Sequence, residues 1–231
     1  MRTLGLLGGM SAESTAIYYR ELNRLVRERL GGLHSADLLL WSVDFAGIAE
    51  LQAQGRWDET GRILADGARR LEGAGAQAIV LCTNTMHLNA PAIEAAIRVP
   101  FLHIGDATAT ALKARGVKRP LLLATRFTME QAFYRDRLAA AGLDCLIPDE
   151  TDRGRLHAII YDELCQGVVN PASKAQALEM VAKARGAGAD GVIFGCTEVG
   201  MLLTQGDLDV PAVDTSLVHC EAAVEFALGR G

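Results

Sequence analysis

The sequence has little of what several common classes of protein require. It contains only four lysines, Lys113, Lys118, Lys174 and Lys183, all in expected helices or loops. A pyridoxal phosphate enzyme needs a Schiff-base lysine, and none of these positions favours one. The five cysteines are odd in number and form no CxxC pair, which favours reduced thiols over a disulfide framework. No Cys and His spacing fits a zinc site, so we expect neither cofactor nor metal.

Long apolar runs and excess positive charge are also missing. No run approaches the length of a membrane-spanning helix. The apolar stretch within residues 1–9 is too short and too interrupted by glycine for a signal peptide, and it predicts a first strand. Without an export signal, we expect a cytoplasmic protein. The net charge of -5 gives no electrostatic reason to bind nucleic acid or an anionic membrane. The glycines of Gly5-x-x-Gly8-Gly9 do not make a dinucleotide-binding GxGxxG.

Two short stretches of the chain resemble each other. Residues 79–85 read IVLCTNT and residues 192–198 read VIFGCTE. Each is an apolar run of the kind found in strands buried on both faces of a parallel sheet, and each is preceded by Gly-Ala-Gly-Ala, typical of a helix end. Cys82 and Cys196 therefore follow the carboxyl ends of buried strands, where open α/β sheets bind their ligands.

The same resemblance extends to a long internal repeat. The pairs Arg2 and Arg119, Cys82 and Cys196, and Val99 and Val210 are displaced by 117, 114 and 111 residues. Strand and helix patterns alternate in both halves, which predicts an α/β fold of two similar halves with mainly parallel sheets. If the halves face each other about a pseudo-two-fold axis, the two Cys-Thr stretches line opposite walls of one cleft.

Two opposed thiols suit a two-base mechanism that inverts a stereocentre, because one removes a proton and the other returns one to the opposite face. Backbone N–H groups and a following helix lower the pKa of a cysteine from its usual value of about 8.5. Thr83, Asn84, Thr85 and Thr197 offer hydrogen bonds to a carboxylate or to an enediolate-like charge.

Structural roles compete with these functional ones. A single buried cysteine at a strand end is more often a core residue, but two in matched contexts favour function. Cys145, Cys165 and Cys220 lack that context, so we expect them to be structural. His87, His103 and His219 follow strands or loops and are candidates for polar wall residues, although a structural role is favoured for each.

Three motifs make the sequence resemble the cofactor-independent aspartate/glutamate racemase family over essentially its whole length. They are Gly8-Gly9-Met10-Ser11-x-Glu13-Ser14-Thr15, Cys82-Thr83-Asn84-Thr85 and Gly195-Cys196-Thr197-Glu198. The similarity is greatest with the broad-specificity amino-acid racemase branch. The resemblance implies two Rossmann-like domains, residues 1–98 with 210–231 and residues 99–209, with the active site between them, and a homodimer.

The resemblance also implies the roles of individual residues in binding an amino-acid substrate. Cys82 and Cys196 would be the two acid/base thiols. The remaining expected contacts to the substrate are Met10, Gln52, Thr83, Asn84, Thr85, Thr125 and Thr197. Aspartate-specific members of the family place an Arg near Gly47–Ile48 and a Lys at the position of Cys165, and both cations are missing here. A broad or non-aspartate specificity follows as a hypothesis.

Three alternatives stay open at this point. One is an aspartate or glutamate racemase of narrow specificity. Another is a maleate-type dicarboxylate isomerase of the same superfamily, since the presence of both Cys-Thr motifs argues against the one-cysteine decarboxylases. The last is a homologue that binds amino acids without catalysis, against which the two cysteines and the polar residues beside them argue.

Overall fold

The computed structural model of the protein describes residues 1–229 of the 231-residue chain. The chain divides into two compact units. The first contains Met1–Ile104 and the described residues from His219 onward, and the second contains Gly105–Val218. No helix within residues 1–229 has both the length and the apolar character needed to cross a membrane.

The first unit is built on a four-stranded parallel sheet in the order β2-β1-β3-β4. Its strands are β1 (Leu4–Gly8), β2 (Leu38–Ser42), β3 (Ala78–Leu81) and β4 (Phe101–Leu102). All residues of β1 and β3 are buried, as expected for strands covered on both faces. Its helical segments are α1 (Ala12–Leu30), α2 (Phe45–Ala53), α3 (Trp57–Gly73), η1 (Thr85–Asn89) and α4 (Ala90–Glu94).

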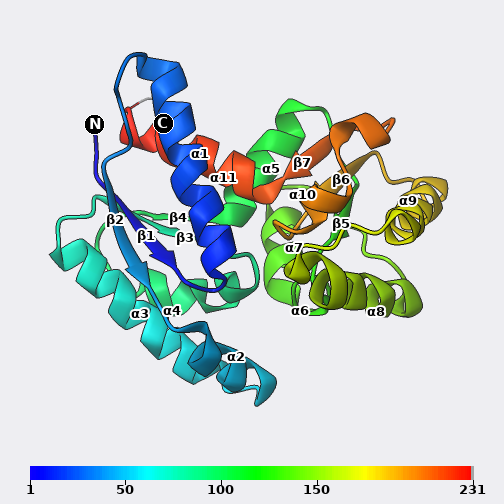
Figure 1. Cartoon of the computed structure of the whole chain (residues 1–231), viewed down its shortest axis with the longest axis horizontal. Coiled ribbons are helices and arrows are strands. Elements are labelled where there is room, and N and C mark those ends of the chain that lie inside the picture. Colours follow the sequence, from blue (N-terminus) through cyan, green and yellow to red (C-terminus); the bar gives the residue numbers. More distant parts are fainter. Residues whose placement is uncertain (230–231) are drawn as a thin grey trace. The chain divides into compact units, whose positions relative to one another are not determined.

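Two cores sandwich this sheet, with α1 and α11 (Thr215–Ala227) on one face and α3 on the other (Figure 1). Leu4 and Leu6 point into the core formed with Tyr18 and Leu22 of α1. Leu7, which alternates with them along β1, points into the core formed with Leu64 of α3. The alternation follows from the pleat of a strand, which turns successive side chains to opposite faces.

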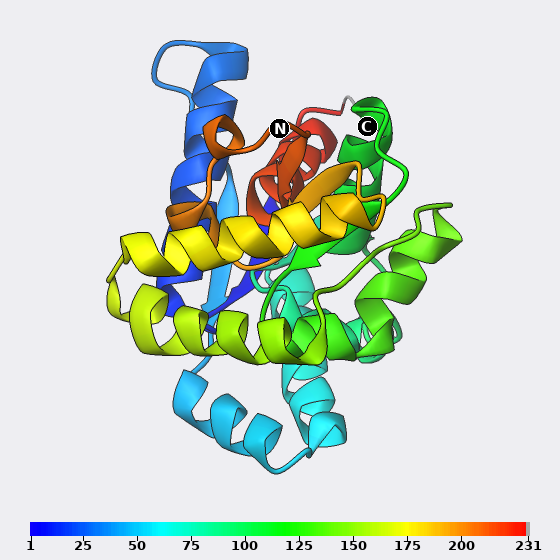
Figure 2. The ribbon, with the colours of Figure 1, turned by 90° about the vertical axis from the view of Figure 1, so that its right-hand side faces the viewer.

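The second unit contains a three-stranded parallel sheet in the order β5-β6-β7. Its strands are β5 (Pro120–Leu123), β6 (Gly191–Phe194) and β7 (Ala212–Asp214). Figure 2 shows α8 and α9 side by side, and an ion pair of 2.6 Å between Lys183 and Asp152 joins them. The helical segments are α5 (Ile104–Ala114), α6 (Arg126–Glu130), α7 (Ala132–Ala140), α8 (Glu150–Ala158), η2 (Ile159–Glu163), η3 (Leu164–Gln166), α9 (Pro171–Gly186), α10 (Val199–Leu202) and η4 (Gln205–Asp207).

The two sheets share a strand order that confirms the predicted α/β repeat. In the first sheet β1, β3 and β4 are consecutive neighbours, and in the second β5, β6 and β7 are. These are the strands that carry the three paired sequence landmarks. The strand that ends before Cys82 and the strand that ends before Gly195-Cys196 thus hold the same place in their sheets.

The boundaries between the two units, after Ile104 and after Val218, come later in the chain than the expected boundaries at residues 98/99 and 209/210. Ile79 and Val80 of β3 pair with Phe101 and Leu102 of β4, which keeps this segment in the first unit. Likewise β7 pairs with β6 and stays in the second unit up to Val218. In each half, therefore, the chain completes one more strand before it leaves the unit.

Three further elements differ from the sequence prediction. A strand was expected over 101–104, but only Phe101–Leu102 is extended, and α5 begins at Ile104. A weak strand was expected over 145–147, and it is reduced to a single bridge between Leu121 and Leu146. A helix expected over about 89–97 is instead the pair η1 and α4, which ends at Glu94.

Candidate active site

In the first unit, the loops that follow β1 and β3 leave the sheet at the same edge. Leu7 pairs with Leu81, and the N–H of Cys82 donates to the carbonyl of Leu7 at 2.9 Å. The chain continues from Leu7 into Gly8-Gly9-Met10, and from Leu81 into Cys82-Thr83-Asn84. Parallel pairing thus places the expected substrate loops beside each other, at the carboxyl ends of the strands.

The turn after β1 is tightly packed and requires its glycines. Gly9 has a φ of 93°, and a Cβ there would overlap the backbone of Val43. A Cβ on Gly8 would lie 2.5 Å from Cγ2 of Thr15. The Gly9 N–H donates to the Thr15 hydroxyl at 2.9 Å, and Ser11 caps α1 by accepting from the Ser14 N–H at 3.2 Å. These bonds fix the backbone that carries Met10.

Met10 and Gln52 are both related to Met86 in the first unit, one through a shared core cluster and the other through a hydrogen bond. Met10 is buried and belongs to the core cluster that includes Met86. The amide Nε2 of Gln52, on α2, donates to the sulfur of Met86 at 2.8 Å. Met86 lies in η1, directly after the Cys82–Thr85 stretch. The structure therefore groups Met10 and Gln52 around the segment that carries Cys82.

The thiol of Cys82 is buried completely, and it lies in the same core cluster as Cys220. The thiol of Cys82 donates to the carbonyl of Val80, with the sulfur 3.8 Å from the oxygen. Burial raises the pKa of the Cys82 thiol far above its ordinary range. The protonated form is therefore strongly favoured in the protein as it stands, because a thiolate would lose its hydration.

A buried histidine holds the loop after Cys82. The ring Nδ1 of His87 lies 2.7 Å from the carbonyl oxygen of Thr83, and its Nε2 accepts from the N–H of Ile104 at 3.2 Å. Because a carbonyl only accepts and an N–H only donates, these partners select the neutral ring with the proton on Nδ1. His87 thus positions Thr83 rather than facing a ligand as a charged group.

His219 has a comparable role at the other side of the same cluster. Its Nε2 lies 2.7 Å from the carbonyl of Leu102, and its Nδ1 lies 2.8 Å from the hydroxyl of Tyr18. Burial, reinforced by His103, lowers the pKa of His219 to about 4. The ring centroid of His87 lies 4.6 Å from that of His103 and 5.8 Å from that of His219. These histidines are buried core residues, so the structural role expected of them is supported.

In the second unit, the corresponding edge brings together the loops after β5 and β6. Leu123 pairs with Phe194, and the N–H of Gly195 donates to the carbonyl of Leu123 at 2.8 Å. The chain then continues to Thr125 in one loop and to Cys196 in the other. A Cβ on Gly195 would lie 2.7 Å from Cδ1 of Leu122 and 2.9 Å from Cβ of Ala124, so this position also requires glycine.

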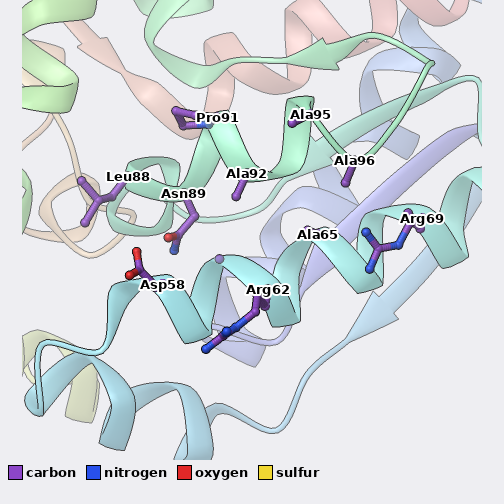
Figure 3. Close-up of a pocket in the computed structure, with 11 residues that line it drawn as sticks. Asp58, Arg62, Ala65, Arg69, Leu88, Asn89, Pro91, Ala92, Ala95 and Ala96 are labelled. Atoms are coloured by element: carbon purple, nitrogen blue, oxygen red, sulfur yellow. The ribbon is translucent and has the colours of Figure 1, made fainter.

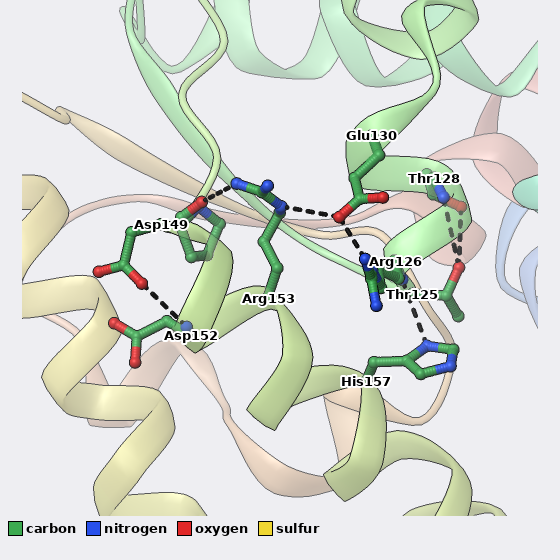
Figure 4. A network of polar contacts seen from close by, with 9 residues as sticks. Thr125, Arg126, Thr128, Glu130, Asp149, Asp152, Arg153 and His157 are labelled. Atoms are coloured by element: carbon green, nitrogen blue, oxygen red, sulfur yellow. Dashed lines mark hydrogen bonds and ion pairs between the residues drawn. The ribbon is translucent and has the colours of Figure 1, made fainter.

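Thr125 is held by a polar network between α6 and α8 (Figure 4). Its hydroxyl caps α6 by accepting from the N–H of Thr128. The N–H of Arg126, the residue after Thr125, donates to Nδ1 of His157 on α8 at 3.4 Å. Glu130 forms ion pairs of 3.0 and 3.1 Å with Arg126 and Arg153. The loop that presents Thr125 is thus held by contacts with both α6 and α8.

Cys196 has a different environment from Cys82. Its side chain is half-buried, and its Sγ lies 2.7 Å from Oε2 of Glu198. The hydroxyl of Thr197 donates to the same carboxylate oxygen at 2.6 Å. Burial and the negative charge of Glu198 raise the pKa of the Cys196 thiol well above its ordinary range. A carboxylate is an acceptor, so the thiol proton lies between the sulfur and Glu198.

Comparisons with known proteins agree on one family. The profile of the Asp/Glu/Hydantoin racemase family matches residues 7–223. The chain belongs to this family. It is 24% identical to the broad-specificity amino-acid racemase RacX of Bacillus subtilis, over 97% of this chain and 98% of that one. Racemases are isomerases, and the family membership makes this chain an amino-acid racemase acting on a small molecule.

Solved structures of similar proteins lead to the same family. A candidate Asp/Glu racemase from Yersinia pestis is 48% identical, with a TM-score of 0.95 and coverage of 99% of this chain and 100% of that one. An aspartate racemase homologue from Pyrococcus horikoshii is 33% identical, with a TM-score of 0.89 and the same coverage. The whole racemase fold is thus shared with both relatives.

Several features of this racemase lie outside the expected site. An open groove of about 540 Å³ runs between α3 and the segment from Leu88 to Ala96 (Figure 3), but it includes none of the expected site residues. Within residues 1–229, no three His, Cys, Asp or Glu side chains are grouped so that they could hold a metal ion. Cys220 is buried as expected, whereas Cys165 is exposed, contrary to the structural role expected for it.

Glu198 is the residue of this racemase that the sequence interpretation missed. It belongs to the Gly195-Cys196-Thr197-Glu198 motif. Its spacing could have indicated a contact with Cys196. A carboxylate two residues after a cysteine, on a turn that leads into a helix, can fold back toward the thiol. The contacts to Cys196 and Thr197 show that it does so.

Proposed function

We propose that this racemase inverts the Cα of amino acids by a two-base mechanism in which Cys82 and Cys196 are the acid/base thiols, without cofactor or metal. The observation that carries the proposal is the matched placement of the two cysteines. Each follows an inner strand of a parallel sheet: β3 lies between β1 and β4, and β6 lies between β5 and β7. The ends of such strands are where α/β folds bind their ligands.

The chemistry balances with one proton taken and one given. A thiolate accepts the α-proton from one face of the substrate, and the electron pair left on Cα delocalises into the α-carboxylate. The thiol of the other cysteine then donates its proton to the opposite face and becomes the thiolate. Turnover of the product enantiomer reverses the two roles. Both pKa values are raised, so the substrate ammonium group must supply the positive charge that favours a thiolate.

Polar side chains of both units would bind the amino and carboxylate groups of the substrate. The Thr197 hydroxyl lies in the loop that carries Cys196 and donates to Glu198, and we propose that this residue also contacts the substrate. Thr125 accepts from the backbone at the start of α6. We propose that Met10 and Gln52 shape the side-chain end of the pocket. The other proposed contacts are Thr83, Asn84 and Thr85.

We propose a broad specificity for the substrate side chain. Positions 47, 48 and 165 carry Gly, Ile and Cys, so no cation stands there to pair with a distal carboxylate. Such a charge-assisted contact contributes roughly 1.5–3 kcal/mol. The Bacillus subtilis relative is itself named a broad-specificity racemase. We further propose, from the resemblance, that the enzyme is a cytoplasmic homodimer that produces D-amino acids.

A narrow aspartate or glutamate racemase is the second candidate. It is favoured by the 48% and 33% identities with an Asp/Glu racemase candidate and an aspartate racemase homologue. The two candidates share the mechanism and differ only in the side chain that the pocket accepts.

Proton NMR in deuterium oxide, with a panel of single-enantiomer amino acids, tests both candidates. A racemase with broad specificity removes the α-proton signal and the circular dichroism of several amino acids. Loss with aspartate or glutamate alone supports the narrow candidate. If no amino acid exchanges its α-proton, the proposed function is wrong, and a binding role or a dicarboxylate isomerase takes its place.

A further inference from the structure

The two proposed catalytic thiols differ in their nearest charged neighbour. Oε2 of Glu198 lies 2.7 Å from the sulfur of Cys196. The sulfur of Cys82 instead lies 3.8 Å from the backbone carbonyl oxygen of Val80, to which its thiol donates. A distance of 2.7 Å is short for any hydrogen bond that involves sulfur. The second hydrogen bond to the same Oε2, from Thr197 at 2.6 Å, orients the carboxylate toward the thiol.

The surroundings of this pair add little that could replace the carboxylate. Tyr161 of η2 and Cys165 of η3 are titratable neighbours of Cys196, and the side chains of tyrosine and cysteine are ordinarily neutral at pH 7. Neither is a base comparable with a carboxylate. Glu198 is thus the group of this cluster that can accept a proton directly from the Cys196 sulfur.

We propose that Glu198 is the proton relay of Cys196: it takes the thiol proton when Cys196 has to act as the base, and it returns that proton when the reaction runs in the other direction. This inference rests on the proposed function and deepens it. Glu198 acts through its contact with the Cys196 sulfur, so it is a positioning and relay residue rather than a catalytic one.

The proton balance of the relay is closed. In the starting form both cysteines are thiols and Glu198 is a carboxylate. Glu198 accepts the proton of Cys196, the Cys196 thiolate accepts the α-proton, and the Cys82 thiol donates its proton to the opposite face. The enzyme is left with a Cys82 thiolate, a Cys196 thiol and a protonated Glu198. This form has the same total charge as the first, and it is the form that the opposite enantiomer requires.

The relay makes a prediction that a merely structural role does not. The equilibrium constant of a racemisation is one, so the two enantiomers keep equal kcat/KM values in every variant. The kinetic isotope effect of α-deuterated substrate is free to differ between them. In Glu198→Gln, removal of the α-proton by Cys196 slows, so the isotope effect on kcat/KM increases for one enantiomer and not for the other.

The experiment compares wild type, Glu198→Gln and Glu198→Asp with α-deuterated substrate of each hand. We expect racemisation by Glu198→Gln to fall by about 10²-fold, the low end of what acid–base catalysis contributes. Glu198→Asp keeps a carboxylate and should recover part of that loss. One enantiomer should show the larger isotope effect in Glu198→Gln. The Cys196→Ser variant should be unable to remove the α-proton of that same enantiomer.

A matched control is available in the same unit. Glu163 accepts a hydrogen bond of 2.7 Å from the hydroxyl of Ser173 rather than from a thiol, so Glu163→Gln makes the same chemical change at a structural carboxylate. It should keep wild-type isotope effects. If Glu198→Gln retains wild-type rates, or if its isotope effect changes equally for both enantiomers, the relay is wrong while the two-thiol mechanism stands. A wild-type enzyme that does not racemise overturns the proposed function instead.

Discussion

The loops after β3 and β6 start from the same sequence, a buried strand followed by Cys-Thr, and differ in how the thiol is surrounded. In the first unit the sulfur lies in the apolar core, and a neutral histidine holds the next carbonyl in place. In the second unit the sulfur lies against a carboxylate. A repeated fold thus supplies two cysteines at equivalent positions, while the residues after them make the two thiols chemically unequal.

The largest expected effect comes from breaking the pair itself. In Cys82→Ser and in Cys196→Ser, racemisation should fall by about 10²–10⁴-fold. A serine hydroxyl is a far weaker acid than a thiol and does not ionise near neutral pH, so it neither donates nor accepts the proton readily. Each variant should still exchange the α-proton of at most one enantiomer with deuterium oxide, and the two variants should spare opposite enantiomers.

Cys220→Ser is the control for these variants, since Cys220 is buried in the same cluster as Cys82. It should change stability but not the stereochemical course of exchange. Near-normal racemisation by either Cys82→Ser or Cys196→Ser would rule out the two-thiol mechanism.

A smaller effect is expected from the glycines that begin the two loops. In Gly9→Ala the added methyl meets the backbone of Val43 and the residue has to adopt a φ of 93°, so unfolding should become easier by roughly 3–5 kcal/mol. In Gly195→Ala the contacts are with the side chains of Leu122 and Ala124, and the cost should be about 1–3 kcal/mol.

Urea unfolding followed by circular dichroism measures both glycine variants. Gly73→Ala is the control, since a Cβ at Gly73 meets no atom within 4 Å, and it should leave the free energy of unfolding nearly unchanged. A Gly195→Ala protein that is less stable than Gly9→Ala would show that the backbone contact at Val43 relaxes easily.

The last expected effect concerns acid stability, and it separates the two units. In the unfolded chain His219 takes up a proton below its ordinary pKa of 6.5, whereas the folded protein lowers this pKa to about 4. Between these pH values the unfolded state binds more protons, so the free energy of unfolding falls as the pH falls. The total loss, complete below pH 4, should be of order 3 kcal/mol.

Fluorescence reports this change in the first unit alone, because both tryptophans, Trp41 and Trp57, belong to it. Acid titration of wild type should show a loss of the folded signal. The His219→Gln protein should be less stable at every pH, but its loss of signal should depend less on pH. His157→Gln, in the second unit, should not alter the titration of the tryptophan signal. An unchanged slope in His219→Gln would mean that another group controls the acid response.

The sequence predicted the fold largely because its strands are short, wholly apolar runs bounded by glycine. The pattern at residues 79–81 and 192–194 leads to β3 and β6, and Ser11 begins α1 as expected. The domain boundaries differed because β4 and β7 are only two and three residues long. Such short strands carry almost no periodicity, and their sheet partners decide where they belong.

The expected site residues could be found from the sequence because they follow strand ends, and that rule does not depend on side-chain conformation. The Cys196–Glu198 contact could not, since it depends on the rotamer of one glutamate at the start of α10. The neutral state of His87 and His219 also depends on partners distant in sequence, Ile104 for one and Tyr18 and Leu102 for the other.

The position of α11 has a consequence for the order in which the protein folds during synthesis. The core of the first unit includes Cys220, Ala223, Val224 and Ala227, packed on the same cluster as Leu4 and Leu6. Segments far apart in the chain must therefore meet, although domains commonly fold in the order of translation. The second unit, whose residues end at Val218, leaves the ribosome whole before the first can close. The half of the protein that is made first is thus the half that is completed last.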